Sequence, residues 1–438
     1  MRITFSTLGT RGDHWLSIAL AAHLIDRDHE VTVAASAGCE RLGAASGARA
    51  AVLPSNATAF YATKDGKRAL NAGGIKAVTE TDRYYARFRD ELDTAMLAAC
   101  EGAEALVATH LTYTRMVAIA DLLRVPVTIL WPLPLLPTRA YSTPALDLPV
   151  RTSSLRLLTH KAVAWEWERK TAKDIAAFRR TIGAPADTRS ALGRICDARA
   201  VQLLPFSPSV LPRAFDWGPE KLMTGWWRLP DHVRADAGET ISADTSAWID
   251  AGAPPFYLGL GSMPVIEPKP LLDDVIAVTA ELGIRALVDA KIAGDGTGLP
   301  THLHSVGATN HDTLFPRCAG VMHHGGAGST AASTRAGVPT MVCSVAFDQH
   351  FWGKRLRDLG AGSHCYFKKL DREQLRTGLA RLRDPAVIEG AARLGAAIEA
   401  EGDGTAIAAH ALEDWLVTAE PLPTAATRGR SARLATAV

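Results

Sequence analysis

The sequence predicts an α/β protein with two doubly wound domains, because strand and helix patterns alternate in two separate series. Strands of the first series are expected at residues 3–8, 29–36, 105–110 and 126–132. Strands of the second series are expected at residues 254–262, 285–290, 319–326 and 339–345. Such alternation is typical of parallel sheets covered by helices. Glycine-rich turns follow strands in both series, at residues 9–14, 259–263 and 323–330.

The first series starts at the N-terminus. Its first strand alternates β-branched and aromatic side chains until the sequence GTRGD breaks the pattern. From Asp13 onward, apolar residues recur at helical spacing and lead to the second strand at 29–36. Residues 132–149 are rich in proline and leucine and predict a loop, and residues 158–183 predict a long amphipathic helix. We therefore assign residues 1–215 to an N-terminal Rossmann-like domain.

A linker and a second domain follow. Residues 216–235 combine glycine, proline and three tryptophans. This composition is typical of a linker whose aromatic side chains pack against another part of the protein. The second series of strands and helices then fills a C-terminal Rossmann-like domain from residue 236 to about residue 403. Residues 421–438 lack periodicity and predict a disordered tail.

Composition excludes several classes of protein. The 438 residues carry a net charge of +2 without a basic run, which argues against nucleic acid as a partner. The six cysteines form no C-x-x-C pair, as expected for reduced thiols rather than a zinc site or a disulfide framework. Neither a signal peptide nor an apolar stretch of about 18 residues is found. We expect a cytoplasmic protein without integral membrane association, and the oligomeric state stays open.

The segment HHGGAGST, residues 323–330, is the first candidate for chemistry. Its glycines leave backbone N–H groups bare at the start of a helix, where the helix dipole also favours an anion. Two hydroxyls add donors, and the histidine at the strand end could become a counter-charge for a leaving phosphate. The predicted diphosphate-binding residues are His324, Gly326, Gly328, Ser329 and Thr330. A tight turn that only packs helix against strand is the alternative.

A second functional interpretation of this turn is a binding site for a nicotinamide cofactor. Residues Gly326 to Ala331 match the G-x-G-x-x-A form of the dinucleotide fingerprint, and Asp348 follows 22 residues after Gly326. That fingerprint usually opens its domain, whereas here at least two strands precede it. The chain after Asp348 is also short for the rest of a six-stranded sheet. An NAD(P)-dependent oxidoreductase therefore stays an alternative.

Polar residues after the last predicted strand suit a polyol. Asp348 supplies a carboxylate acceptor, and the amide of Gln349 can donate and accept. On its own, Asp348 would equally well cap the following helix. Beside a phosphate site, the pair predicts a sugar attached to a diphosphate.

The first turn contains the candidate bases. Asp13 begins a helix after the first strand, so it is either a helix cap or a general base facing a cleft between the domains. His14 is the alternative base, because neighbouring helix residues point about 100° apart and only one is expected to face the cleft. His110 ends another strand and could orient an acceptor, although a structural histidine is the more ordinary interpretation. The D-x-D at Asp26 and Asp28 falls at the wrong end of the sheet for a metal site.

Together these segments resemble the family 1 glycosyltransferases of GT-B fold, especially the bacterial natural-product and sterol enzymes. The resemblance rests on TLGTRGD, PPFYLGLGSM, LFPRCAGVMHHGGAGSTAASTRAGVPT and FDQHFWGKRLRDLGAG, in this order. It implies an acceptor in the N-terminal domain and a nucleotide sugar in the C-terminal domain. It also implies a last helix, at residues 404–420, that returns to the N-terminal domain. Inversion at the anomeric carbon without a metal or other cofactor is the implied reaction.

By position, the resemblance gives Asp13 the role of catalytic base. Gly261 and Ser262 match the turn that approaches the donor phosphates, and Asp348 with Gln349 matches the pair that holds sugar hydroxyls. The sequence departs from the family pattern at three places. Leu16 stands where the family often has proline, and His14 stands where small or aliphatic residues are usual. The third is the segment GATNHDTLF at 307–315, which occupies the place of the family's nucleobase-binding segment. That segment lacks a tryptophan, so His311 is the candidate for base contacts, and UDP and dTDP both stay open.

We therefore expect an enzyme that moves a hexose from a nucleotide diphosphate sugar to a hydroxyl of a small, mostly apolar acceptor such as a natural product or a sterol. The apolar acceptor rests on the loop at 130–150 and on Trp165 and Trp167. A catalytically inactive partner protein of the same fold is a further alternative.

Overall fold

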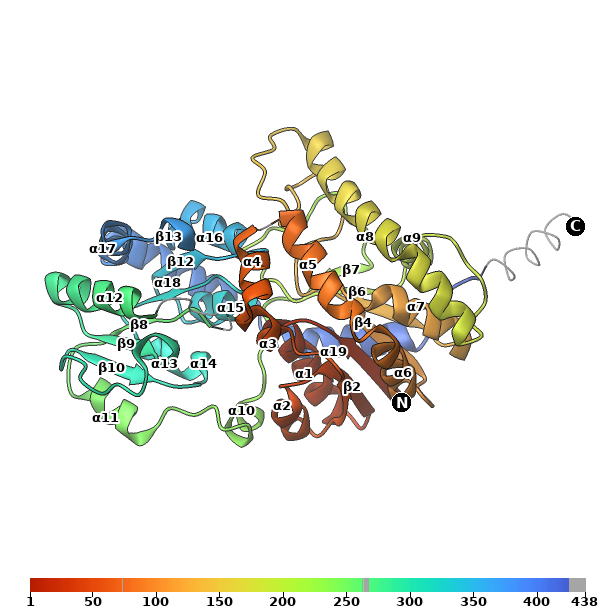
Figure 1. The fold of residues 1–438 in the computed structure, drawn as a ribbon, viewed down its shortest axis with the longest axis horizontal. Helices are drawn as coiled ribbons and strands as arrows, with labels where there is room; N and C mark the ends of the chain where they lie inside the picture. The colour runs from red at the N-terminus through yellow and green to blue at the C-terminus, as the bar shows by residue number, and fades with distance from the viewer. Residues whose placement is uncertain (73, 262, 264–267, 425–438) are drawn as a thin grey trace, which may run out of the picture.

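The computed structural model describes residues 1–72, 74–261, 263 and 268–424. Two parallel sheets form the centres of two domains, which lie side by side in Figure 1. The N-terminal domain is drawn in red to yellow, and the C-terminal domain in green to blue. This is the arrangement of two doubly wound domains that the sequence predicts.

The first sheet has seven strands in the order β3-β2-β1-β4-β5-β6-β7, all paired in parallel. Its strands are β1 (Arg2–Thr7), β2 (Glu30–Ser36), β3 (Arg49–Leu53), β4 (Ala105–Thr109), β5 (Val127–Leu130), β6 (Gln202–Leu204) and β7 (Lys221–Met223). The accompanying helices are α1 (Arg11–Ile25), α2 (Glu40–Ala45), α3 (Ala57–Ala62), α4 (Lys64–Ala72), α5 (Gly74–Ala86), α6 (Arg89–Ala99), α7 (Tyr113–Leu123), α8 (Ser153–Thr181) and α9 (Ala191–Asp197).

The second sheet has six parallel strands in the order β10-β9-β8-β11-β12-β13. They are β8 (Phe256–Leu258), β9 (Ala286–Asp289), β10 (Leu303–Val306), β11 (Gly320–His323), β12 (Thr340–Ser344) and β13 (Gly362–Tyr366). The remaining helices are α10 (Asp231–Asp236), α11 (Ala243–Asp250), α12 (Pro268–Leu282), α13 (Ala290–Ala293), α14 (His311–Leu314), α15 (Ala327–Arg335), α16 (Gln349–Asp358), α17 (Arg372–Arg381), α18 (Pro385–Glu399) and α19 (Gly404–Leu416), with 3₁₀ turns η1 (Phe315–Arg317) and η2 (Phe367–Lys369).

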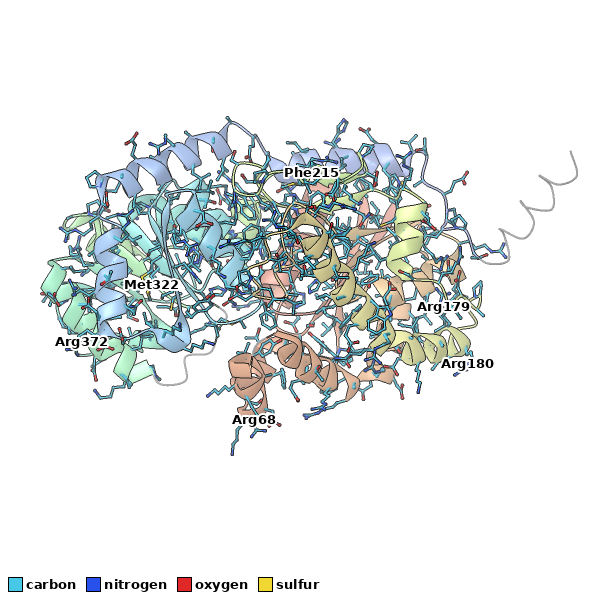
Figure 2. All side chains as sticks on the ribbon, turned by 90° about the horizontal axis from the view of Figure 1, so that it is seen from above. Arg68, Arg179, Arg180, Phe215, Met322 and Arg372 are labelled. Atoms are coloured by element: carbon cyan, nitrogen blue, oxygen red, sulfur yellow. The ribbon has the colours of Figure 1, made fainter. Side chains whose placement is uncertain are left out.

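Apolar layers cover both faces of the first sheet. Phe5 lies in a buried cluster with Ile18 of α1 and Ala409 of α19, so the last helix of the described chain packs on the first domain. Leu106 lies in the cluster on the other face with Met116 of α7. Burying such side chains is the main favourable term that holds helices on a sheet. Figure 2 shows Met322 of β11 inside the second domain, whereas Arg68 and Arg372 project from the surface.

The segment expected to be a linker, residues 216–235, also completes the first sheet. Its residues 221–223 form β7, which pairs with β6. Trp226 packs against Trp352 of α16 with ring centroids 5.4 Å apart. The connection therefore touches both domains.

The tail expected to be disordered, residues 421–438, is ordered at its start. Leu422 is buried, and the carbonyl oxygen of Pro423 accepts a hydrogen bond from Arg189 at 2.7 Å. This apolar anchor on the N-terminal domain explains the difference, because the expectation considered only the lack of periodicity. Residues 425–438 lie outside the described residues.

A loop of the first domain reaches across to the second. Asp147, in the proline-rich segment after β5, accepts a hydrogen bond from the Tyr366 hydroxyl at 2.5 Å and forms an ion pair with Lys354 of α16. Arg355 donates to the Val210 carbonyl oxygen at 2.8 Å. These contacts hold the domains against each other on one side of the space between their sheets.

Candidate active site

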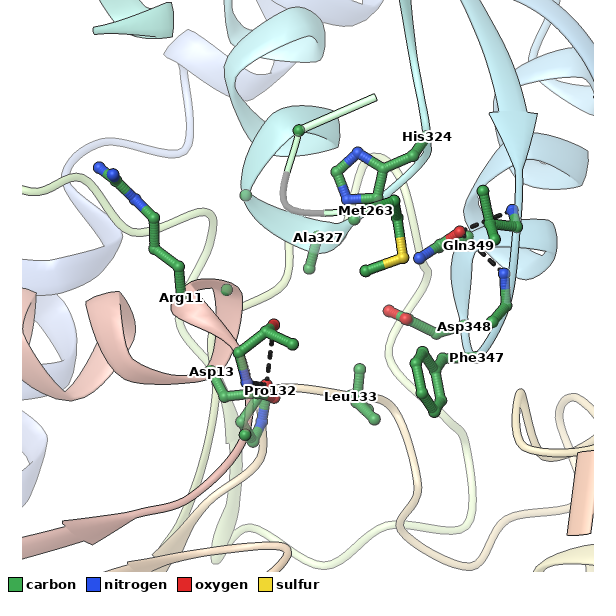
Figure 3. A pocket seen from close by; sticks show the side chains of 18 of the residues that line it. Arg11, Asp13, Pro132, Leu133, Met263, His324, Ala327, Phe347, Asp348 and Gln349 are labelled. Carbon is green, nitrogen blue, oxygen red and sulfur yellow. Dashed lines mark hydrogen bonds between the residues drawn. The ribbon is translucent and has the colours of Figure 1, made fainter. Parts of the chain in front are cut away.

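A large cleft lies between the two domains, with a volume of about 1450 Å³. Small-molecule sites commonly enclose about 300–1,000 Å³, so the cleft has room for two ligands. The turn after β1 lines one wall, and the turns after β11 and β12 line the opposite wall (Figure 3). These are carboxyl ends of strands, where parallel α/β domains bind their ligands.

The turn after β1 holds Asp13 at the start of α1. Its Oδ2 accepts hydrogen bonds from the Thr10 backbone N–H at 2.8 Å and from the Thr10 hydroxyl at 3.2 Å. Asp13 is the third residue of the helix, where a carboxylate satisfies a free backbone donor and faces the positive end of the helix dipole. Burial outweighs these contacts and raises the pKa of Asp13 to about 6. The half-buried side chain is thus mostly ionised at neutral pH.

His14 has a different position. Its ring is buried, with Nε2 3.1 Å from the Gly9 carbonyl oxygen and Nδ1 3.3 Å from the Thr7 hydroxyl. Burial lowers the pKa of His14 to about 4, so the imidazole is neutral. Gly9 has a φ of +128°, and a Cβ atom there would overlap the Asp13 carboxylate. Both ring nitrogens of His14 therefore hold the turn that shapes the Asp13 site.

The turn after β11 is held by the first of its two histidines. His323 is buried, accepts a hydrogen bond from the Gly325 N–H on Nδ1 at 2.9 Å, and lies 3.2 Å from the Ser333 hydroxyl with Nε2. Gly325 has a φ of +88°, and a Cβ atom there would lie 2.5 Å from Val342. A residue with a side chain does not fit, so this glycine fixes how the chain enters α15.

The start of α15 lacks a side-chain cap, because glycine occupies the N-cap position. Gly326, Gly328 and Ser329 line the cleft, whereas Thr330 is buried and does not. Ser329 and Thr330 are neighbours on a helix and point about 100° apart, which is why only one of them faces the cleft. The open helix end suits an anion.

His324 lies beside this helix end (Figure 3). Glycines flank its ring closely: a Cβ atom on Gly261 would lie 2.5 Å from Cε1, and one on Gly326 would lie 2.5 Å from Nε2. Nδ1 is buried and has no hydrogen-bond partner among the described residues. Burial lowers the pKa of His324 to about 3, with contributions from His311 and Lys291. The imidazole is therefore neutral in this state, whereas its role as a counter-charge for a leaving phosphate, suggested by the sequence, stays a prediction.

A lysine that sequence reasoning missed lies next to His324. Lys291, in the first turn of α13, lines the cleft and donates from Nζ to the carbonyl oxygen of Gly261. Because β9 pairs with β8, the turn after β9 comes beside the turn that contains Gly261. The strand order supplies this proximity, and the sequence spacing gives no sign of it. Ser262, the next predicted phosphate contact, lies outside the described residues.

Asp348 and Gln349 lie on the same wall (Figure 3). The Asp348 carboxylate is buried and accepts a hydrogen bond from Trp352 Nε1 at 2.5 Å. Burial raises the pKa of Asp348 to about 7, and the charge of Asp13 adds to this. Gln349 accepts from the backbone N–H groups of Val345 and Ala346 with Oε1, at 2.8 and 3.0 Å, which leaves its NH₂ group toward the cleft.

Phe347 gives this turn its unusual shape. Its φ is +56°, a left-handed conformation that is costly for a bulky residue. Residues in such conformations cluster at functional sites, where the surrounding structure maintains the strain. The Phe347 ring packs against Tyr61 of α3, with ring centroids 5.9 Å apart. A contact from the N-terminal domain thus supports the position of the two polar residues that follow.

His311 forms part of a further section of the cleft. Its ring stacks on Phe315 with centroids 4.4 Å apart, and burial lowers its pKa to about 4. Arg234 and Arg335 line the same section and both pair with Asp312. Their Nε groups are buried without hydrogen-bond partners among the described residues. Sequence reasoning missed both arginines, because one lies in the linker and the other at the far end of α15.

The N-terminal half of the cleft is mostly apolar. Trp131, Leu133 and Trp167 line it, together with the imidazole of His110. Trp165, expected to be an acceptor contact, is 65% exposed and does not line the cleft. It lies two residues from Trp167 on α8, so the two rings point to different sides of the helix.

The described residues contain neither a metal-binding cluster nor a membrane-spanning helix. No group of three or more histidine, cysteine, aspartate or glutamate side chains is arranged there to hold a metal ion. Among the same residues, none of the helices has the length and apolar character needed to cross a bilayer.

Comparison with known proteins gives consistent matches. Residues 269–413 match the model of the erythromycin biosynthesis protein CIII-like C-terminal domain. The chain is 30% identical to O-mycaminosyltylonolide 6-deoxyallosyltransferase of Streptomyces fradiae over 444 residues, which cover 98% of this chain and 100% of the relative. It is 28% identical to a sterol 3-beta-glucosyltransferase of Arabidopsis thaliana, over 97% of this chain and 69% of the relative.

The fold has solved counterparts. The crystal structure of the glycosyltransferase VinC in complex with dTDP superposes with a TM-score of 0.64 at 17% identity, covering 95% of this chain and 99% of that one. This likeness concerns the fold, whereas the full-length relative at 30% identity establishes the family. The nicotinamide oxidoreductase and the inactive partner are therefore not retained. The chain belongs to the family 1 glycosyltransferases of GT-B fold and is an enzyme.

Proposed function

We propose that this enzyme transfers a hexose from a UDP- or dTDP-sugar to a hydroxyl of a small, mostly apolar acceptor, with inversion and without a metal ion or other cofactor. The observation that carries the proposal is that one cleft joins Asp13, the open end of α15 and the Asp348–Gln349 pair. A base, an anion site and a polyol site are the three parts that such a transfer needs.

Asp13 is the proposed general base. Two bonds from Thr10 occupy its Oδ2, so Oδ1 is the oxygen available to take the proton of the attacking hydroxyl. A pKa near 6 leaves the group ionised at neutral pH and still basic enough to accept a proton. His14 is a poorer base, since its nitrogens already have partners within the turn.

The opposite wall would stabilise the leaving diphosphate. The uncapped end of α15 offers backbone N–H groups, and Ser329 adds a hydroxyl. Neutral His324 donates one N–H, and Lys291 supplies a full positive charge at the same edge. Donors placed where negative charge develops lower the barrier most when they need no rearrangement. Attack from the Asp13 side and departure on the α15 side amount to an in-line displacement, which inverts the anomeric carbon.

The polar pair after β12 would hold the sugar. The Asp348 carboxylate accepts hydrogen bonds and the Gln349 NH₂ group donates them, which matches hydroxyls that do both. Buried N–H groups of Arg234 and Arg335 suit the carbonyl oxygens of a pyrimidine base next to His311. The dTDP bound to VinC and the O-mycaminosyltylonolide and sterol substrates named for the two relatives support a nucleotide donor and an apolar acceptor.

Nucleotide release from a panel of UDP- and dTDP-sugars, measured with and without hydroxylated apolar acceptors, tests this function. We expect acceptor-dependent release of one nucleotide, unchanged by EDTA, and a thermal shift with the same nucleotide alone. An α-linked donor should give a β-linked product by NMR. No release with any donor overturns the proposal, and an α-linked product overturns the inverting mechanism.

A further inference from the structure

The acceptor half of the cleft contains buried polar atoms that its own protein neighbours do not satisfy. Three side chains that line this half each have one: Tyr85 Oη, His110 Nδ1 and Trp167 Nε1. His110 Nδ1 and Trp167 Nε1 have no hydrogen-bond partner among the described residues, and Tyr85 Oη has only the Gly9 N–H beside it, which leaves the hydroxyl proton without an acceptor there. Leaving such a group buried and unpaired costs about 1–3 kcal/mol. In a ligand cleft, a bound water, ion or ligand is what supplies the missing partner of such a group.

His110 lies directly beside the turn that carries Asp13. It follows β4, which pairs with β1 so that Ala108 is opposite Ser6. The Thr112 hydroxyl donates to the Ser6 carbonyl oxygen at 2.8 Å and fastens the turn after β4 to β1. Neighbouring strands are about 4.8 Å apart, so the imidazole is held one strand away from the Asp13 turn. Burial lowers its pKa to about 4, which makes it a neutral hydrogen-bonding group at pH 7.

Tyr85 approaches the same place from α5. Its ring is buried, and burial raises the pKa of its hydroxyl well above the usual value. The charge of Asp13 raises this pKa further and a hydrogen bond from the Gly9 N–H lowers it, so the hydroxyl lies against the turn that carries the proposed base. Tyr84, the preceding residue, is different: its hydroxyl accepts a hydrogen bond from the Asn56 N–H at 2.7 Å, and its ring does not line the cleft.

The rest of this half is mostly apolar but not entirely so. The Trp131 ring suits a carbon framework, and Asp82 and Lys170, which also line the wall, already bind other side chains. Sites of this kind fix the orientation of an apolar ligand by one or two hydrogen bonds. His110 and Tyr85 each keep an unused hydrogen-bonding position, and both lie near the turn that carries the proposed base.

We propose that the acceptor of this enzyme is polyoxygenated, with a second hydroxyl or carbonyl oxygen beside the hydroxyl that is glycosylated, and that His110 and Tyr85 bind this second oxygen. A framework with a single hydroxyl, such as a simple sterol, leaves His110 Nδ1 and the Tyr85 hydroxyl proton unpaired and is a poor acceptor. His110 and Tyr85 are positioning residues in this account, since Asp13 takes the proton. The inference rests on the proposed glycosyl transfer and adds the acceptor class.

Acceptors that differ only in the place of a second hydroxyl test the inference. We would use 2-naphthol, 2,3-dihydroxynaphthalene and 2,7-dihydroxynaphthalene with the best nucleotide sugar, and measure kcat/KM from nucleotide release. The two diols share size and number of hydroxyls, so their ratio isolates the effect of proximity. We expect the 2,3-diol to exceed the 2,7-diol by about tenfold, mainly through KM, as one or two hydrogen bonds would give.

Two substitutions locate the effect. Tyr85→Phe and His110→Phe keep an aromatic ring and remove the polar atoms, and each should bring the ratio of the two diols to about two or less. Tyr84→Phe, a matched change outside the cleft, should keep both the ratio and the turnover. Thermal shifts with the nucleotide alone show that each variant is folded and binds the donor.

The outcomes separate the two proposals. A ratio near one in the wild type, or a high ratio that survives both substitutions, overturns the polyoxygenated acceptor and leaves the transfer itself intact. Absence of nucleotide release with all three acceptors and every donor overturns the glycosyl transfer, and with it this inference. A ratio that falls equally in Tyr84→Phe also overturns it, because the effect would then not come from the cleft.

Discussion

The two turns that face each other across the cleft have the same backbone design and opposite chemistry. In each turn, the helix begins four residues after the last residue of the strand. The connecting residues include a glycine with positive φ, followed by an N-cap residue in an extended conformation. The corresponding pairs are Gly9 and Gly325, Thr10 and Gly326, Gly12 and Gly328, and Asp13 and Ser329.

The difference lies in how each helix end is satisfied. In α1 the carboxylate of Asp13 bonds back to the Thr10 N–H, so the helix end already has its anion. In α15 the equivalent residue is Ser329 and the N-cap is glycine, so the end stays open to an anion from outside. One side-chain carboxylate thus separates a turn that can hold a base from a turn that can hold a diphosphate.

The largest effect is expected from removing the carboxylate of the first turn. Asp13→Asn should lower kcat by about a thousandfold, because general-base catalysis typically contributes 10²–10⁴-fold. His14→Asn should disturb the turn and lower the thermal midpoint, with a smaller loss of kcat per folded molecule. Nucleotide release measures kcat for both variants, and thermal denaturation measures their thermal midpoints. Full activity of Asp13→Asn would show that another residue is the base.

Removing a carboxylate from the opposite wall should change stability in a pH-dependent way. The folded-state pKa of Asp348 is raised from 3.8 to about 7, so burial of its charge destabilises the folded enzyme as pH rises through this range. The penalty is absent below pH 4, grows up to pH 7 and is constant above it. Asp348→Asn should therefore stabilise the enzyme at pH 8, by on the order of 4 kcal/mol, and lose sugar transfer.

Thermal midpoints at pH 8 and pH 4 measure this gain. Asp236→Asn, on the exposed surface of α10, is the matched control and should change neither midpoint. A midpoint of Asp348→Asn that is unchanged at pH 8 would contradict the buried charge.

The acid limb of the activity profile tests the base in another way. Because Asp13 must be ionised to accept a proton and its pKa is about 6, kcat/KM should fall tenfold per pH unit below pH 6. The same limb should persist in any residual activity of Asp348→Asn. A limb that disappears in this variant belongs to Asp348 and not to Asp13.

A smaller effect is expected from the cation beside the second turn. Lys291→Met should weaken dTDP binding about tenfold and reduce its salt dependence, since a partly exposed charge contributes about 1 kcal/mol. Lys291→Arg should largely restore binding. Lys269→Met, on the exposed start of α12, is the control for loss of a positive charge elsewhere. Equal weakening in both methionine variants would mean that only the overall charge matters.

The sequence predicts the backbone of both turns well, because glycine spacing and strand–helix alternation are local properties. It could not show which way side chains point. Thr330 carries the right chemistry but turns into the interior, and both nitrogens of His14 serve the turn itself. Such directions depend on helical phase and on packing partners elsewhere in the chain.

Other parts of the site depend on the order of strands in the second sheet or on strain. Lys291 reaches Gly261 only because β9 lies beside β8. Phe347 adopts a left-handed conformation that its residue type disfavours, so local propensity predicts the opposite. The sequence suggests that His324 could become a counter-charge for a leaving phosphate, and only the folded structure shows that burial between two glycines keeps its imidazole neutral without a ligand. Each of these requires the folded structure.

Titration of dTDP into the wild type, Asp13→Asn and Ser329→Asp tests the comparison most directly. Ser329→Asp gives the second helix the carboxylate of the first, so the account predicts at least about 100-fold weaker binding of dTDP, with Ser329→Asn as the neutral control within a few-fold of the wild type. Asp13→Asn should bind dTDP as the wild type does. Unchanged binding by Ser329→Asp, or an equal loss in Asp13→Asn, would contradict the claim that the open end of α15 holds the diphosphate.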